Sequence, residues 1–148
     1  VGDTRHSVEF FDMAARNGRS WDEVRRSREE CAAAWLERGP EMHLSGRLED
    51  ALDAYERALV LAPWSATAWA RKGYALRQIG RNAEANTCYD HALAAEPQNP
   101  DAWRNKADAL AALGRQVEAG MCRTEAERLA LVAAGRQANG INGKAMPA

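Results

Sequence analysis

Histidine and cysteine are the residue types from which catalytic nucleophiles and zinc sites are most often built. The 148-residue chain contains three of each, widely scattered. They are His6, His43 and His91, and Cys31, Cys88 and Cys122. No histidine stands with a cysteine and an acid at the spacing of a catalytic triad, and the sequence has neither a paired CxxC motif nor a glycine-rich phosphate loop. We therefore predict that this chain is not an enzyme and holds no metal ion and no cofactor.

Cys88 and His91 lie three residues apart, a spacing that places two side chains on the same face of a helix. Two ligands do not make a zinc site, because a structural zinc ion takes four and a catalytic one three. We interpret Cys88 as a packed structural thiol and His91 as a surface residue.

A basic cluster comprises Arg25, Arg26 and Arg28, and arginine is well suited to phosphate. Glu29 and Glu30 follow immediately and oppose such contacts. The formal net charge of the chain is -1, so bulk electrostatics attracts neither nucleic acid nor an acidic lipid surface. We predict no nucleic-acid partner.

The sequence contains no apolar run near the roughly 18 residues that a membrane-spanning helix needs, so we predict no membrane insertion. Three cysteines without the spacing of a disulfide framework are typical of a reducing compartment. We therefore expect a cytoplasmic protein. The chain starts at Val1 rather than at a methionine, which fits a fragment or a processed form.

The tryptophans reveal an internal repeat. Trp35, Trp69 and Trp103 each follow the last after 34 residues, and several small or turn-forming residues keep the same step. These positions are Gly46, Gly80 and Gly114; Ala51, Ala85 and Ala119; Ala58, Ala92 and Ala126; Gly39, Gly73 and Ala107; Tyr55 and Tyr89; and Pro63 and Pro97. A period of this length is the signature of a helical repeat array.

The repeat resembles the tetratricopeptide family at its signature positions, over about residues 32–133. The second copy is the closest match, with Trp69, Gly73, Gly80, Ala85, Tyr89, Ala92 and Pro97. The resemblance implies an all-α fold, in which helix-turn-helix units stack into a right-handed superhelical solenoid with a concave groove.

The physical roles of these residues agree with that fold. Gly80 can take the left-handed conformation that ends a helix, and Pro97 cannot continue a helix interior. Gly73 and Ala85 lack bulk where two antiparallel helices approach each other. About three such pairs are needed for stability, because one pair buries too little apolar surface.

The chain divides at the repeat boundaries. We predict three repeats over residues 32–65, 66–99 and 100–133. Residues 1–31 form an N-terminal helical cap or docking segment, and residues 134–148 form a flexible tail with three glycines.

The first and third copies depart from the pattern. Pro40 follows Gly39 inside the expected first helix, where an interior proline costs about 3 kcal/mol, so we expect a kink or a stop near Gly39. In the third copy, Arg123 and Leu131 replace the tyrosine and the proline, and we expect its second helix to run to about Ala134. No further amphipathic helix follows to cover the last repeat, and an uncovered apolar edge favours self-association.

The N-terminal segment has its own helix signals. Phe10, Phe11, Met13 and Ala14 suggest one short helix ended by Asn17 and Gly18. Ser20 and Glu23 have the spacing of a capping box, and an apolar pattern from Trp21 predicts a second helix that runs into the first repeat.

The resemblance implies that the first helix of each repeat lines a concave face on which extended peptides often bind. Three arginines with Asn105 would form a forked donor set suited to carboxylates, and Tyr74 adds a flat contact surface. The predicted groove residues are Arg71, Tyr74, Arg77, Gln78, Arg104, Asn105 and Asp108, with Leu36, Glu37, His43 and Leu44 from the first copy. The alternative interpretation is an ordinary solvated face with ion pairs along each helix.

One use of this family is a two-carboxylate clamp that grips the C-terminus of a chaperone. It needs Lys and Asn in the first repeat and Lys and Arg in the third. The corresponding places here hold Leu36, Pro40, Asp101 and Asn105, so we predict that this chain is not such a clamp.

We therefore predict a non-catalytic adaptor or scaffold that binds a partner peptide or helix in the groove. The alternatives are a module that forms a homo-oligomer through its N-terminal helices or its last repeat, a protein like the bacterial secretion chaperones, and a regulatory domain of a larger enzyme.

Overall fold

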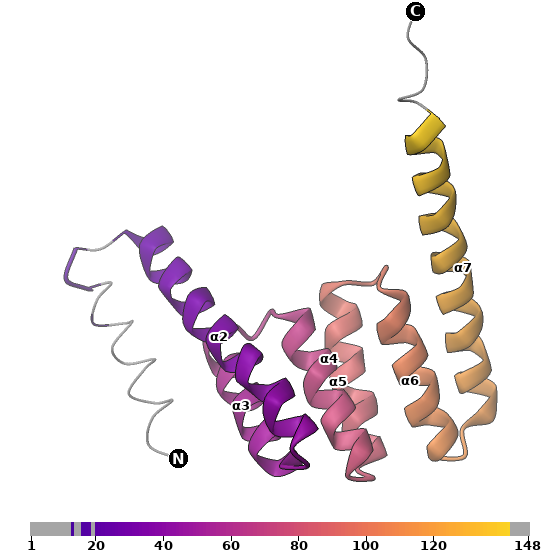
Figure 1. Cartoon of the computed structure of the whole chain (residues 1–148), viewed down its shortest axis with the longest axis horizontal. Coiled ribbons are helices and arrows are strands. Elements are labelled where there is room, and N and C mark those ends of the chain that lie inside the picture. The colour runs from indigo at the N-terminus through magenta and orange to yellow at the C-terminus, as the bar shows by residue number, and fades with distance from the viewer. Residues whose placement is uncertain (1–12, 14–15, 19, 143–148) are drawn as a thin grey trace, which may run out of the picture.

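The computed structural model describes residues 13, 16–18 and 20–142, and these residues contain six helices and no strand. Consecutive helices form three pairs that lie side by side in a row (Figure 1). The helices are α2 (Trp21–Leu44), α3 (Leu48–Leu61), α4 (Ala66–Gln78), α5 (Asn82–Ala95), α6 (Pro100–Ala112) and α7 (Gln116–Asn142). The predicted all-α solenoid of helix-turn-helix units is confirmed. None of the helices in this part of the chain is long and apolar enough to cross a membrane.

A glycine ends the first helix of each pair. Gly46, Gly80 and Gly114 have φ angles of 75°, 89° and 77°, in the left-handed region that side chains with a Cβ rarely adopt. The residue after each glycine donates its N–H to a carbonyl five residues back, as in the 2.9 Å bond from Arg81 to Leu76. This Schellman motif satisfies the last carbonyls of the helix and turns the chain back for the second helix.

Glycine and tyrosine pack against each other within the first two repeats. A Cβ added to Gly39 would lie 2.1 Å from Cε1 of Tyr55, and one added to Gly73 would lie 2.9 Å from Cε1 of Tyr89. In the third repeat Ala107 stands in the glycine position, where the opposing residue is arginine rather than tyrosine. In the first two repeats the glycine therefore leaves space for the tyrosine ring, and this space lets the two helices of each pair approach closely.

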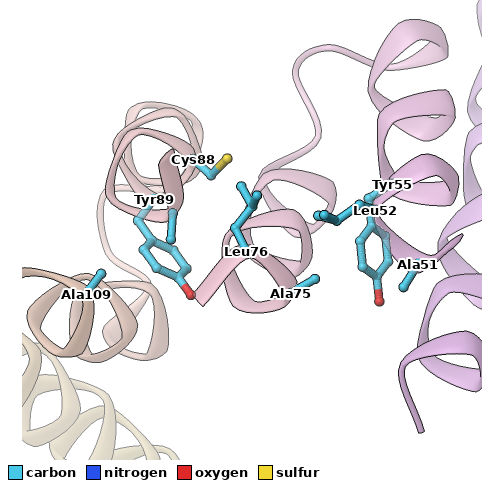
Figure 2. Packing of buried hydrophobic residues seen from close by; sticks show 9 residues of the cluster. Ala51, Leu52, Tyr55, Ala75, Leu76, Cys88, Tyr89 and Ala109 are labelled. Carbon is cyan, nitrogen blue, oxygen red and sulfur yellow. The ribbon is translucent and has the colours of Figure 1, made fainter. Parts of the chain in front are cut away.

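The main core runs across the repeats. Its buried residues come from α3, α4, α5 and α6, so one continuous apolar cluster joins all three pairs (Figure 2). They are Ala51, Leu52, Tyr55, Ala75, Leu76, Ala85, Cys88, Tyr89 and Ala109. The alanines at Ala51, Ala85 and Ala119, and those at Ala58, Ala92 and Ala126, are all buried.

Two of the repeat tryptophans fasten the turns between repeats. Trp69 Nε1 donates a hydrogen bond to the carbonyl of Pro63 at 2.8 Å, and Trp103 Nε1 donates to that of Pro97 at 2.9 Å. Trp35 has a different setting, because it lies in the middle of α2, where the guanidinium of Arg57 stacks over its ring at 4.8 Å.

Helix α2 runs without interruption through Pro40 to Leu44, so a stop near Gly39 is wrong. The packing of Gly39 on Tyr55 holds this part of α2 against α3. The carbonyl that the proline leaves without a partner receives a hydrogen bond from α4. Both contacts offset the cost of the interior proline. The expected kink remains a prediction.

The start of α2 follows the sequence signals. Ser20 Oγ accepts a bond from Glu23 N at 3.2 Å, and the Glu23 carboxylate accepts one from Ser20 N at 3.1 Å, which completes the capping box. The shorter helix predicted before it, with Phe10 and Phe11, lies largely outside the described residues.

Helix α7 continues to Asn142, so the helix end predicted near Ala134 is wrong. Gly135 lowers helix propensity by about 1 kcal/mol relative to alanine, but the neighbouring Ala133, Ala134 and Gln137 favour helix. The last turns project beyond the other helices (Figure 1), and residues 131–137 are exposed. Flexibility of residues 134–148 remains a prediction.

Candidate functional site

The first helices of the three pairs, α2, α4 and α6, surround a hollow of about 520 Å³. Its lining comes from all three repeats, so only their stacking creates it. The lining residues are Pro40, His43 and Leu44 of α2, Tyr55 of α3, Ala70, Arg71 and Tyr74 of α4, and Asn105 of α6. We call this the central hollow. Five predicted groove residues line it: His43, Leu44, Arg71, Tyr74 and Asn105.

The walls of the central hollow are largely apolar and aromatic. Leu44 is 86% exposed and Tyr74 is 39% exposed, although both are large apolar side chains. The His43 ring lies against that of Tyr74, with 5.2 Å between centroids. Large side chains left accessible in a concave place are typical of a binding surface.

Arg71 reaches the hollow but is already engaged. Its Nη1 donates a hydrogen bond to the backbone carbonyl of Leu36 at 2.6 Å. Leu36 lies four residues before Pro40, and its carbonyl would accept the helix bond that a proline cannot donate. Arg71 therefore satisfies a backbone acceptor across two repeats, which the sequence analysis did not foresee.

Arg77 is also engaged across the repeats. Its Nη1 lies 3.0 Å from Asp108 Oδ2 of α6, and its guanidinium stacks over the Tyr74 ring at 5.4 Å. Arg123 of α7 approaches the other oxygen of Asp108 at 3.9 Å. The buried Tyr89 hydroxyl lies near this group, and burial raises its pKa, while the charge of Arg77 lowers it. Asp108 is thus the shared anion of two arginines rather than a free ligand-binding group.

The remaining predicted residues lie outside the central hollow. Arg104 pairs with Asp101 of its own helix at 2.7 Å, and Gln78 is exposed at the end of α4. Arg104 and Asp108 instead line a smaller hollow of about 300 Å³ between α6 and α7, together with Arg123. Arg104 and Asp108 are thus separated from the residues of the central hollow, and four further predicted groove residues line neither hollow: Leu36, Glu37, Arg77 and Gln78.

Pro40 and Tyr55 line the central hollow, although sequence reasoning assigned neither to binding. Tyr55 belongs to the second helix α3. It was interpreted as a core position, and its ring is indeed buried against Gly39. Its edge lines the hollow beside Arg71. Burial raises the pKa of the Tyr55 phenol, and the nearby Arg71 lowers it. A position that serves both the core and the groove has no separate signal in the sequence.

Cys88 and His91 lie in different surroundings. Cys88 is buried, and burial raises the pKa of its thiol to about 11, which keeps it protonated and unreactive at neutral pH. His91 is exposed and stacks on Trp69 at 4.3 Å. Across the described ranges no three His, Cys, Asp or Glu side chains are grouped so that they could hold a metal ion.

The fold and this groove define a helical-repeat protein, and the sequence profile of one family matches most of the chain. The tetratricopeptide repeat profile matches residues 19–66, 44–85 and 70–121. The chain therefore belongs to the tetratricopeptide repeat family. No curated protein matches the sequence.

Solved structures show the same fold. The second tetratricopeptide domain of Spaghetti (RPAP3), bound to the HSP90 peptide SRMEEVD, superposes with a TM-score of 0.70 and 21% identity, covering 72% of this chain and 98% of that one. MamA superposes with a TM-score of 0.69 and 18% identity, over 90% of this chain and 81% of that one. The translocator chaperone SycD of Yersinia enterocolitica gives 0.65 and 19%, over 68% and 76%.

Proposed function

We propose that this chain is a non-catalytic protein-binding module, an adaptor or scaffold, that takes a peptide or a helix of a partner into the central hollow. The observation that carries the proposal is the hollow itself, which is built jointly by three repeats and leaves Tyr74 and Leu44 accessible. Large exposed side chains at the centre of a concave surface commonly dominate binding energy. The similar RPAP3 domain holds a peptide, and so does SycD, which has been solved with a peptide of the translocator YopD.

The polar groups of the hollow suit a polypeptide ligand. The Asn105 side chain offers both donors and an acceptor, and no hydrogen bond joins it to another group within the described part of the chain. Peptide backbone needs partners of both kinds when it is taken out of water. An extended segment that places one large side chain beside Tyr74 and its backbone beside Asn105 would satisfy these requirements.

Selection of peptides from a displayed random library on the full chain tests this function. We expect the selected peptides to lose at least about tenfold in affinity when Tyr74→Ala is introduced, because an aromatic anchor is worth about 1.4 kcal/mol or more. Asn105→Ala should weaken the binding of the same peptides.

The matched control is Thr87→Ala, an exposed position on the second helix α5 that does not line the hollow. It should leave affinity unchanged. Peptides that bind the Tyr74 and Thr87 variants equally well would show that binding occurs elsewhere.

A homo-oligomer, as in the secretion-chaperone alternative, is the second candidate. It is favoured by apolar side chains left in solvent at the two ends: Trp21 of α2 is 74% exposed, and Val117, Met121 and Leu131 of α7 are 80%, 68% and 74% exposed. Light scattering at several concentrations measures the oligomeric state. A concentration-dependent mass that Met121→Gln with Leu131→Gln abolishes would support an interface on α7, whereas a constant monomer mass removes this candidate.

A cytoplasmic location and a place within a larger enzyme are also proposals. Peptide binding in the central hollow is compatible with both.

A further inference from the structure

The three arginines predicted for the groove differ in what they bind. Arg77 pairs with Asp108 of α6 at 3.0 Å, and Arg104 pairs with an acid of its own helix at 2.7 Å. Arg71 instead donates Nη1 to the neutral backbone carbonyl of Leu36 at 2.6 Å. Within the described part of the chain no carboxylate pairs with Arg71, so it is the one arginine of the three whose charge has no anionic partner.

The bond to Leu36 holds the Arg71 guanidinium in place and leaves most of its donors. A guanidinium carries several N–H donors, and this bond uses one of them. The half-buried Arg71 side chain lines the central hollow. Burial raises the pKa of the Tyr55 phenol, which lines the same hollow, and the charge of Arg71 lowers it. Arg71 is therefore a positioned cation whose charge acts within the hollow.

The rest of the lining favours a carboxylate as the partner of Arg71. None of the described lining residues is acidic, and the other polar ones are His43, Tyr55, Tyr74 and Asn105. A cation in a partly apolar recess is less well hydrated than one on an open surface, so a carboxylate that reaches it gains more from the pair. Such a pair is charge-assisted, and the carboxylate can accept from two guanidinium donors at once.

Apolar surface on two helices favours an acidic side chain within a peptide over a carboxylate at its end. Pro40 and Leu44 on α2 and Tyr74 on α4 line the central hollow. An internal acid has neighbours on both sides that can pack on these surfaces, whereas a terminal carboxylate has neighbours on one side. A C-terminal aspartate or glutamate would in addition bring a second carboxylate, and Arg71 is the only arginine or lysine in the described lining.

We propose that Arg71 binds a single acidic side chain within the partner segment, so that the central hollow selects an aspartate or glutamate flanked by apolar or aromatic residues. This inference rests on the proposed peptide-binding function and names the class of segment. Pro40 assists, because a proline has no N–H for the Leu36 carbonyl, and that carbonyl holds the guanidinium in place. The site differs from a two-carboxylate clamp, since it uses one arginine of the middle repeat.

Three pools of short peptides, applied to the immobilised full chain, measure the ligand class. Every pool has an acetylated N-terminus and random uncharged residues around one fixed central residue. The first pool has a central glutamate and an amidated C-terminus, the second a central glutamine and an amidated C-terminus, and the third a central glutamine and a free C-terminal carboxylate. Mass spectrometry quantifies the retained peptides. We expect the first pool to be retained at least about fivefold more than either of the others, since it alone offers Arg71 a side-chain carboxylate.

Arg71→Gln tests the assignment to Arg71, because glutamine keeps N–H donors but has no charge. It should reduce the preference for the glutamate pool to within about twofold. The matched control is Lys72→Gln, which removes the same charge from the next position of α4, where Lys72 pairs with Glu56 and does not line the hollow. This control should keep the preference.

A second pair of variants keeps the test valid if Arg71→Gln does not fold, which circular dichroism would show. Pro40→Ala restores an N–H for the Leu36 carbonyl, so Arg71 is no longer needed there. The Pro40→Ala variant should prefer the glutamate pool, and Pro40→Ala combined with Arg71→Gln should not.

Three results would overturn the inference. They are equal retention of the glutamate and glutamine pools by the wild type, a preference for glutamate that survives the loss of Arg71, and a third pool retained as well as the first, which would assign the hollow to a chain terminus. The proposed function would stand in each case as long as Tyr74→Ala reduces retention. A wild type that retains none of the pools would instead contradict the proposed function itself.

Discussion

The Tyr55 side chain determines which residue type position 39 can hold. The Tyr55 ring occupies the space in which a Cβ of residue 39 would lie, at 2.1 Å from Cε1. Real Cβ atoms do not approach so closely, so only glycine fits without a shift of the ring or the helix. The third repeat makes the same point in reverse, because Ala107 is accepted where the opposing residue is Arg123.

Gly39→Ala should lower the free energy of unfolding by about 1–3 kcal/mol, because the added methyl overpacks the contact with Tyr55. The matched control is Gly120→Ala in α7, where nothing lies within 4 Å of the added Cβ. There the substitution should raise stability by up to about 1 kcal/mol, through better helix propensity. Urea unfolding midpoints measure both effects, and two variants with the same change would refute the argument.

At the scale of the element, first and second helices start in different ways. The first helices have side-chain N-caps: Ser20 for α2, Ser65 for α4 and Asn99 for α6. The second helices α3 and α5 have no side-chain cap and follow the glycine turns directly. An arginine at their start pairs with an acid in the first turn, as Arg81 does with Glu84 at 2.6 Å. Among these five helices, side-chain N-caps are therefore found only on the first helix of each pair.

Asn99→Ala should destabilise the chain by about 1 kcal/mol, because Oδ1 of Asn99 accepts from the backbone N–H groups of Asp101 and Ala102 at the start of α6. Gln98→Ala, one residue earlier and exposed, should be neutral within about 0.5 kcal/mol. Thermal unfolding followed by circular dichroism compares the two, and an equal loss at both positions would count against the cap.

At the scale of the whole molecule, one core cluster joins all three repeats and contains a titratable thiol. Cys88 is buried in that cluster, close to Tyr89 and Leu76 (Figure 2). Burial raises the pKa of the Cys88 thiol from its ordinary 9.0 to about 11. Burial also raises the pKa of the Tyr89 hydroxyl. Neutral forms of both groups are therefore part of the folded state.

The stability of the chain should fall as the pH rises from about 9 towards 11. A raised folded-state pKa means that the folded chain holds its proton more tightly, so the contribution is complete below pH 9 and is lost through pH 11. Urea midpoints measured between pH 8 and pH 11 test this, and Cys88→Ala should flatten the decline. A wild type and a Cys88→Ala variant with identical pH profiles would show that the thiol contributes nothing.

The sequence predicted the repeats well because their signals are local and recur. A tryptophan and a turn glycine recur in all three copies, and a glycine–tyrosine pair recurs in the first two, so the 34-residue period is visible in the sequence alone. The bond from Arg71 to Leu36 could not be predicted in this way, because it joins residues 35 positions apart and depends on an N–H that is missing. The groove prediction placed Arg71 near the hollow but did not include the backbone carbonyl that its guanidinium binds.

The hydrogen bonds from Trp69 and Trp103 to the proline carbonyls before them define a repeat unit that includes its own connecting turn. Because Trp69 holds Pro63 and Trp103 holds Pro97, each connecting turn belongs to the repeat that follows it. A block from Pro63 to Glu96 contains its own turn together with the Trp69 bond that holds it. The turn at Pro97, held by Trp103, then follows at the junction. Duplication or deletion of such a block would change the length of the array and keep a tryptophan bond at each proline turn, so the position before each of these prolines is a suitable place to cut.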